Sequence, residues 1–278
     1  MMVGYINKII PFSPVDGPGN RTAIFLQGCN FNCIYCHNPE TINICSNCGL
    51  CKAKCPTKAI DIIEGLVIWN KDKCCNCDEC IKTCQNSSSP KIQRLTADEV
   101  INEILNYRPF IQGITVSGGE CTLQENFIIE LFTKAKDIGL TCFIDSNGSK
   151  NFSEMKELLE LCDGVMLDVK CFENNEHKKY INFNNSNVLN NLEFLASINK
   201  LYEVRTVVVP EIFNNEETVR EVSKVIFKYN SNIRYKIISF RKYGVRKEFS
   251  HLKSPESEYI QELKDISKQM GCNNIIIV

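Results

Sequence analysis

The chain has 278 residues, of which 44% are hydrophobic and 23% are charged, so it can bury a large core in one large and one small domain. Its 32 basic and 33 acidic residues give a net charge of -1, with no long block of like charge, so we expect neither a nucleic-acid nor a membrane partner. Seventeen cysteines without a secretory leader or a membrane-spanning apolar run predict a cytoplasmic metal protein with reduced thiols.

The first predicted element of interest is a strand, "TAIFL", that runs directly into three cysteines. Cys29, Cys33 and Cys36 have the spacing C-x3-C-x2-C. Structural zinc sites normally use four protein ligands, and ferredoxin-type runs contain four cysteines. Three thiolates therefore indicate a metal centre with one open position, where chemistry can take place.

An internal repeat follows, in which the run C-x2-C-x2-C-x3-C occurs twice. In two-cluster ferredoxins the fourth cysteine of each run binds the cluster held by the other run. A pair of zinc sites would leave two cysteines of each run unexplained, and Cys75 is out of register with the ligands. The repeat predicts two 4Fe–4S clusters, one on Cys45, Cys48, Cys51 and Cys84 and the other on Cys74, Cys77, Cys80 and Cys55.

Outside the repeat, apolar β-branched runs alternate with segments of helical periodicity. The predicted strands are "TAIFLQG", "GITVSG", "TCFIDSN", "GVMLDVK", "YEVRTVVVP" and "IRYKIISF". Thr96 and Glu99 predict a capping box on the first helix, and Gly139 a helix end. Six such strands predict an α/β fold, a partial (β/α)6 TIM-like barrel, with its site at the carboxyl ends of the strands. We expect a core in two parts, 1–44 and 96–278, interrupted by a ferredoxin-like insert at 45–95.

These motifs resemble those of a known family. The cysteine triad after the first strand and Gly-Gly-Glu after the second are similar to the signature of radical S-adenosylmethionine (SAM) enzymes. The stretches "DGPGNR" and "CHNP" resemble the activating enzymes of glycyl radical enzymes. The insert resembles that of the larger, three-cluster activases, and runs such as "IIPFSPVDGPG" and "CDGVMLDVK" most resemble the YjjW-type branch.

The resemblance implies a role for individual residues. Cys29, Cys33 and Cys36 would bind the cluster whose free iron is chelated by SAM, and Asp16 would meet the glycyl loop of the partner. Tyr35 would shield the cluster, and Lys170 and Arg205 would contact SAM. The resemblance also places Gly118, Gly119 and Glu120 on the SAM amino group, Asp145, Ser146, Met166 and Asp168 around a monovalent cation (Na+ or K+), and Asn147 and Arg241 among the other SAM contacts.

Two positions depart from the family pattern. Cys121 follows Gly-Gly-Glu where many relatives have proline, and we expect it to be an inert small residue. Arg241 stands where the family often has histidine. The remaining cysteines lie in strand or helix patterns and are predicted to be buried apolar thiols: Cys142, Cys162, Cys171 and Cys272.

The resemblance implies an oxidoreductase that cleaves SAM reductively and removes a Cα hydrogen from a glycine of a partner glycyl radical enzyme. Glycine fits this role because a residue without a side chain lets its Cα reach deep into a crevice. Three 4Fe–4S clusters, a flavodoxin or ferredoxin electron donor and a monomeric, anaerobic enzyme are part of this expectation. The alternatives are a radical SAM enzyme acting on a small molecule and a non-catalytic iron–sulfur electron carrier.

Overall fold

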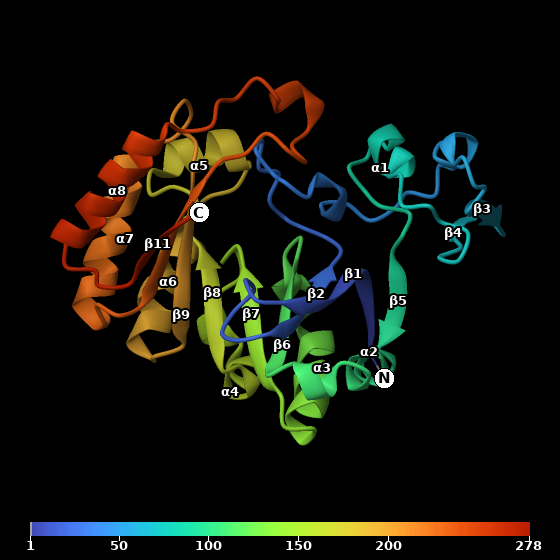
Figure 1. Ribbon diagram of the computed structural model, residues 1–278, viewed down its shortest axis with the longest axis horizontal. Helices are drawn as coiled ribbons and strands as arrows, with labels where there is room; N and C mark the ends of the chain where they lie inside the picture. Colours follow the sequence, from blue (N-terminus) through green and yellow to red (C-terminus); the bar gives the residue numbers. More distant parts are fainter. Residues whose placement is uncertain (1) are drawn as a thin grey trace.

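The computed structural model describes residues 2–278, which form a curved nine-stranded sheet with helices on its outer side and a small lobe beyond one edge (Figure 1). The strands lie in the order β11-β10-β9-β8-β7-β6-β2-β1-β5. From β2 to β11 every neighbouring pair is parallel, whereas β1 is antiparallel to both β2 and β5. The bounds are β1 Val3–Ser13, β2 Arg21–Leu26, β5 Gln93–Thr96, β6 Gly113–Gly118, β7 Thr141–Ser146, β8 Gly164–Asp168, β9 Leu201–Val208, β10 Arg234–Ser239 and β11 Ile275–Ile277.

Helices connect the parallel strands and pack against one another in chain order, as the contacts α2·α3, α3·α4, α6·α7 and α7·α8 show. Each buries an apolar stripe against the sheet; in α3, for example, Phe127, Ile128, Leu131 and Phe132 are buried. The bounds are α2 Ala97–Leu105, α3 Glu125–Asp137, α4 Lys156–Leu161, α5 Asn174–Ile181, α6 Ser186–Ser197, α7 Asn215–Tyr229 and α8 Ser257–Gln269.

The α/β class and the six parallel strands expected from the sequence are confirmed. The capping box of Thr96 and Glu99 is present at α2, and Gly139 has a φ of +73° just after α3. The two outer antiparallel strands, β1 and β5, were not predicted, and neither were β11, α5, α6 and α8. The sheet is therefore an open, partial TIM-like barrel with an antiparallel extension at its first edge.

The cysteine repeat forms the small lobe, which stands beyond β5 in Figure 1. Its hairpin, β3 (Ile60–Ile63) and β4 (Leu66–Trp69), turns at Glu64 and Gly65, both with positive φ, as a tight hairpin turn requires. The hairpin and the short helix α1 (Glu79–Thr83) share a small core that contains Cys51, Ile60 and Cys80. This core buries few apolar side chains compared with the core of the large sheet.

The two chain segments that enter and leave the lobe are joined at its base. Asn43 N donates to Ser87 O at 3.1 Å, and Asn43 Nδ2 donates to Asn86 O at 2.9 Å. Residues 93–95, expected at the end of the insert, belong instead to β5 and pair with β1. The return into the core therefore begins at Gln93, slightly earlier than the sequence predicted.

Arg21, from the "DGPGNR" stretch, has its side chain fully buried at the start of β2. Its guanidinium donates to Thr115 Oγ1 at 2.9 Å, Ile114 O at 2.7 Å and Thr141 O at 2.8 Å, and it lies 4.5 Å above the ring of Phe143. Burial lowers its pKa to about 10. Arg21 thus ties the amino ends of β2, β6 and β7 together, which is a structural role.

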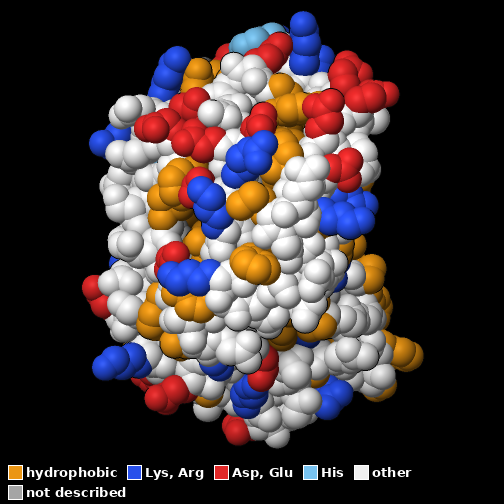
Figure 2. Space-filling model, turned by 90° about the vertical axis from the view of Figure 1, so that its left-hand side faces the viewer, with side chains coloured by type: hydrophobic (Ala, Val, Ile, Leu, Met, Phe, Trp, Pro, Cys, Tyr) orange, Lys and Arg blue, Asp and Glu red, His pale blue; other side chains and the backbone are white. Residues whose placement is uncertain are grey.

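On the face toward α7 and α8, Lys and Arg side chains alternate with Asp and Glu side chains, and apolar side chains are scattered between them (Figure 2). The charged side chains of this face therefore do not form a continuous basic surface of the kind that nucleic acids bind.

Within residues 2–278, none of the helices combines the length and the apolar composition that a membrane-spanning helix needs.

Candidate functional site

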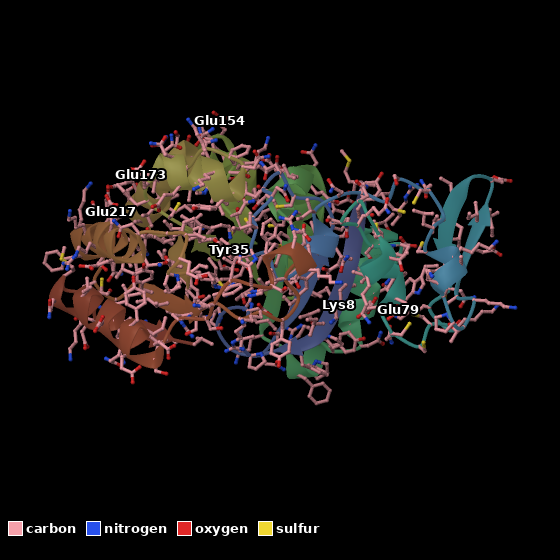
Figure 3. The ribbon with its side chains drawn as sticks, turned by 90° about the horizontal axis from the view of Figure 1, so that it is seen from above. Lys8, Tyr35, Glu79, Glu154, Glu173 and Glu217 are labelled. Carbon is pink, nitrogen blue, oxygen red and sulfur yellow. The ribbon has the colours of Figure 1, made fainter. Side chains whose placement is uncertain are left out.

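A cavity of about 210 Å³ opens at the carboxyl ends of the parallel strands, where the predicted site was expected. It is lined from one side by the cysteine loop that follows β2 and from the other by the residues at the ends of β6, β7 and β8. Seen from above, Tyr35 lies at the centre of the molecule, whereas Glu79 marks the separate lobe (Figure 3). The lining residues include Cys29, Tyr35, Cys33, Cys36, Gly118, Gly119, Asp145, Ser146, Asn147, Asp168 and Lys170.

The cysteine loop is held in place by its own backbone. Cys29 N donates to Ile42 O at 2.8 Å, and Ile34 N donates to Tyr180 O of α5 at 3.0 Å. Burial raises the pKa of the Cys29 thiol, and likewise that of Cys33, to about 12. A bound metal centre would oppose this rise, because its positive charge favours the thiolate form.

Gly118 and Gly119 are glycines because two chain segments meet there. A Cβ on Gly118, whose φ is +124°, would lie 2.2 Å from Leu26 O, and a Cβ on Gly119 would lie 2.3 Å from Gly28 O. The end of β6 is thereby pressed onto the start of the cysteine loop, and Glu120 N donates to Gly28 O at 2.7 Å. The glycines set the width of the cavity as well as lining it.

The Glu120 side chain, predicted to contact the SAM amino group, lies behind the wall of the cavity. It is 1% exposed and does not line the cavity. Its carboxylate accepts hydrogen bonds from Thr122 N at 3.0 Å, Ser146 Oγ at 2.8 Å and Asn147 N at 2.6 Å. Burial raises its pKa while these donors oppose the rise. In this structure Glu120 ties the glycine loop to the end of β7, which places Asn147 in the cavity wall.

A buried charged row crosses the strands just below the cavity. Arg205 Nη1 donates to Asp145 Oδ2 at 2.9 Å, Arg205 Nη2 donates to Met166 Sδ at 2.9 Å, and Arg205 Nε pairs with Glu203. Burial raises the pKa of Asp145 to about 6, although the Arg205 charge opposes the rise. Lys236 and Arg234 also pair with Glu203 at 3.0 and 2.7 Å, so Glu203 has three cationic partners and Asp145 one.

Lys170 and Asp168 form a second pair, with Nζ and Oδ2 2.9 Å apart, and both line the cavity. The pKa of Lys170 is raised: the carboxylate of Asp168 and neighbouring acidic groups outweigh its burial. Lys170 is therefore a fixed positive charge beside Cys33. A ligand carboxylate in the cavity could form a charge-assisted hydrogen bond with this cation.

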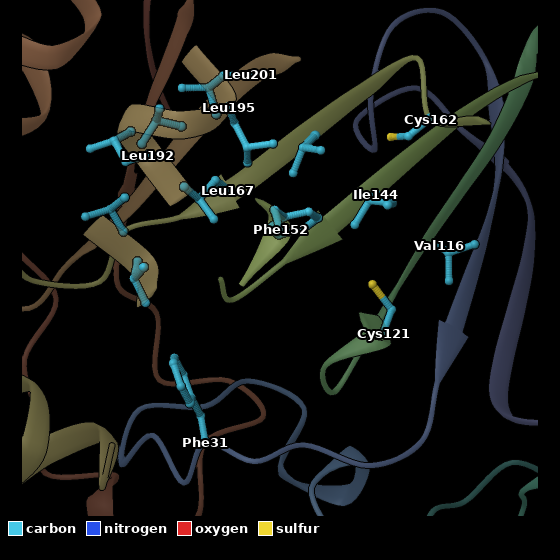
Figure 4. Packing of buried hydrophobic residues seen from close by; sticks show 14 of the residues in the cluster. Phe31, Val116, Cys121, Ile144, Phe152, Cys162, Leu167, Leu192, Leu195 and Leu201 are labelled. Carbon is cyan, nitrogen blue, oxygen red and sulfur yellow. The ribbon is translucent and has the colours of Figure 1, made fainter. Parts of the chain in front are cut away.

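Other predicted site residues lie outside the cavity. Asp16 is half-buried: its carboxylate accepts a hydrogen bond from Ser13 Oγ at 2.5 Å, and its carbonyl accepts one from Thr115 Oγ1 at 2.5 Å. Met166 and Arg205 lie in the charged row. The side chain of Arg241 is exposed, and its carbonyl oxygen lies 2.8 Å from His37 Nε2 in the cysteine loop. Cys121 is packed among the buried residues near Ile144 and Val116 (Figure 4), and the four expected buried cysteines are confirmed: Cys142, Cys162, Cys171 and Cys272.

The cysteines of the lobe gather around two further cavities. One of them is lined by Cys45, Cys48, Cys51, Cys80 and Cys84, and the other by Cys55, Cys74, Cys75, Cys77 and Cys80, so that Cys80 lines both. Each cavity thus includes the four cysteines of one predicted set and one further cysteine, which is Cys80 in the first cavity and Cys75 in the second. Within residues 2–278 no three His, Cys, Asp or Glu side chains are placed to hold a single metal ion. A 4Fe–4S cluster has a different requirement, because each of its thiolates binds its own iron atom.

Several site residues were missed by the sequence analysis. His37 and Phe31 line the cavity, and Arg246 donates hydrogen bonds to the cysteine loop from a segment more than two hundred residues away. His37 belongs to the "CHNP" stretch, so its position in a motif was a usable signal. Nothing in the local pattern around Arg246 could have indicated its contact, because it depends on the tertiary fold.

Comparison with known proteins agrees with the geometry. The model of the radical SAM superfamily matches residues 23–224. A protein of Haemophilus influenzae that carries the name glycyl-radical enzyme activating enzyme is 29% identical over 98% of this chain and 96% of its own length. The pyruvate formate-lyase-activating enzyme of Staphylococcus aureus is 26% identical over 94% of both chains.

Solved structures show the same fold at low identity. QueE from Escherichia coli superposes with a TM-score of 0.57 and 12% identity, covering 100% of this chain and 95% of its own. A domain of pyruvate-formate lyase-activating enzyme from Bacteroides vulgatus gives a TM-score of 0.50 at 17% identity and covers 60% of this chain and 99% of its own. At these identities the likeness extends to the fold alone.

Proposed function

Because the chain belongs to the radical SAM superfamily, we propose that it is an activating enzyme that installs a radical on a glycine of a partner glycyl radical enzyme. The observation that carries this proposal is the near full-length similarity to the named activating enzyme of Haemophilus influenzae. When bound, the 4Fe–4S cluster and SAM would together supply the 5′-deoxyadenosyl radical that takes the hydrogen from the glycine Cα.

The residues of the cavity have distinct tasks in this proposal. Cys29, Cys33 and Cys36 hold the cluster, and the mainly apolar wall containing Tyr35 excludes water from it. Lys170 orients the SAM carboxylate, and Gly118 and Gly119 offer backbone groups to its amino group. The monovalent cation would be held by Asp145, Ser146, Met166 and Asp168, of which Asp145, Ser146 and Asp168 line the cavity.

The finer assignments are also part of the proposal. The two cysteine-lined cavities of the lobe support two additional clusters, and hence a three-cluster activase. The proposal of the YjjW-type branch rests on the sequence motifs alone. A flavodoxin or ferredoxin would supply the electrons. We further propose that the enzyme is a monomer and works in the cytoplasm.

The substitution Asp16→Asn tests the glycine-directed function. Arg205 Nη2 lies 3.5 Å from the carbonyl oxygen of Val15, so Asp16 is next to the charged row beside the cavity. If it meets the glycyl loop of the partner, partner-free SAM cleavage should stay nearly unchanged while the glycyl radical yield falls several-fold. Electron paramagnetic resonance (EPR) of the partner measures that yield. Asp72→Asn, which removes an exposed acid of the lobe, is the control.

A glycyl radical yield equal to that of the control under limiting enzyme would assign Asp16 a structural role in holding Ser13. Formation of 5′-deoxyadenosine only with an added metabolite, and never a radical on a protein, would instead favour a small-molecule radical SAM enzyme. Absence of SAM cleavage under strong reductant would favour an electron carrier.

The lobe should be separable from the SAM site. The double substitution Cys48→Ala with Cys77→Ala removes one ligand from each lobe cavity. With dithionite as reductant we expect SAM cleavage at nearly the unmodified rate, whereas activity with reduced flavodoxin should be lost. Equal loss of both activities in a protein that remains folded would make the lobe part of the SAM site.

A further inference from the structure

The segment that follows β10 lies across the outside of the cysteine loop and contacts it at two places. His37 Nε2 is 2.8 Å from Arg241 O, and the His37 ring stacks on Phe240 with centroids 5.8 Å apart. Gly244, with a φ of +83°, lies so close that a Cβ there would be 2.3 Å from His37 O. We refer to residues 240–249 as the strap.

At the other end of the loop a single side chain makes the contact. Arg246 Nη1 donates to Asn32 Oδ1 at 2.7 Å, Nη2 donates to Cys33 O at 3.0 Å, and Nη2 also lies 3.4 Å from Asn32 O. The Arg246 side chain is 17% exposed and lies over the ring of Phe249, so it has limited freedom to leave this position. Its planar fork joins two successive residues of the loop, which a lysine could not do.

Arg246 acts on the cysteine loop through its positive charge as well as through its hydrogen bonds. The Arg246 guanidinium is held 3.0 Å from the carbonyl oxygen of Cys33, a member of the cysteine triad, so its positive charge lies close to the loop that would hold the cluster. A positive charge beside a cluster stabilises the more negative, reduced state and so raises the reduction potential of that cluster. The effects of the hydrogen bonds and of the charge can be separated experimentally, because Arg246→Lys keeps the positive charge but removes the planar guanidinium.

From these contacts we infer that Arg246 is a positioning residue: through the strap it fixes the cysteine loop in its cluster-binding shape and sets the potential of the cluster held there. The inference rests on the proposed function only for the identity of the cluster. The fixing of the loop belongs to the protein chain itself and can be measured without any metal.

The first test uses the full-length, cluster-free chain and the variants Arg246→Gln, Arg246→Lys and Lys247→Gln. Lys247 is an exposed neighbour on the strap and serves as the control. Amide hydrogen exchange of Ile34 and Cys36 should accelerate on the order of tenfold in Arg246→Gln and Arg246→Lys, because a charge-assisted pair of hydrogen bonds is lost. Exchange at the control rate in both variants would overturn the inference.

The second test uses the reconstituted protein and the EPR signal that changes when SAM is added, which marks this cluster among the others. Arg246→Gln should lower its midpoint potential and release its iron to a chelator several-fold faster. Arg246→Lys should restore the potential but not the iron retention. A potential unchanged in Arg246→Gln would overturn the electrostatic part. If the unmodified chain shows no SAM-sensitive signal, the proposed function fails, while the exchange result still decides the role of Arg246.

Discussion

Replacing Cys33 by alanine should abolish SAM cleavage and lower the iron content from about twelve to about eight atoms per chain after anaerobic reconstitution. Cys33 is 7% exposed, lines the central cavity beside Lys170, and belongs to the cysteine triad that we propose as the ligands of the SAM-binding cluster. The two clusters proposed for the lobe should remain, because Cys33 lines neither of the two lobe cavities. The cleavage product 5′-deoxyadenosine, measured with dithionite as reductant, should fall below detection.

Cys142→Ala is the matched control for this substitution. Cys142 is fully buried in the hydrophobic core and lines neither the central cavity nor the two lobe cavities. Its loss should cost some stability from the space left behind but should leave about twelve irons and the activity in place. An unmodified protein that binds only about four irons at full occupancy would contradict the two-cluster interpretation of the lobe.

The parts of the fold that the sequence predicted are those with a strong local signal. β2, β6, β7, β8, β9 and β10 are apolar runs followed by polar motifs, which is typical of strands in a parallel sheet. β1 was missed because it lies outside the parallel set, and much of it is only half-buried. β11, with three residues, is too short to show a period. Its pairing with β10 depends on α8 turning the chain back.

The site could be predicted where a residue and its partners lie in one motif. The cysteine triad, the glycine pair and Lys170 all line one cavity, since parallel strands place their carboxyl ends together. The direction in which a side chain points could not be predicted. Glu120 turns toward Ser146 and Asn147, and that choice depends on donors from a strand that is distant in sequence.

The charged row shows the same limit. From their positions in motifs, Asp145 was predicted to contact a cation and Arg205 to contact SAM. The motifs gave no indication that the two side chains pair with each other. Glu203, Arg234 and Lys236 complete the row from β9 and β10, and they were not singled out. A buried carboxylate with three cations is recognised only once the sheet register brings β9 and β10 side by side.

Arg205→Gln should destabilise the cluster-free chain by about 3–5 kcal/mol, as expected when one partner of a buried ion pair is removed. Its guanidinium contacts Glu203, Asp145 and Met166, and its side chain is 10% exposed. The two carboxylates would be affected differently. Glu203 keeps Lys236 and Arg234, whereas Asp145 keeps only the Ser117 hydroxyl at 2.9 Å.

The unpaired Asp145 gives this loss of stability a defined pH dependence. Its pKa is already raised to about 6 with Arg205 present, and removing the cation should raise it further. A carboxyl whose folded pKa lies above its unfolded value binds more protons in the folded state, so stability falls as pH rises through that interval. The deficit of Arg205→Gln, measured by urea unfolding, should therefore be larger at pH 8 than at pH 5. Adding Asp145→Asn should recover part of it and remove the pH dependence.

A surface arginine provides the comparison for this prediction. Arg220 pairs with Glu216 on the exposed face of α7 at 2.7 Å, and Arg220→Gln should cost no more than about 0.5 kcal/mol. The same deficit for both variants, or a deficit of Arg205→Gln that is constant between pH 5 and 8, would show that Asp145 does not depend on Arg205. In that case the ion pair with Arg205 could not be what keeps Asp145 charged at neutral pH.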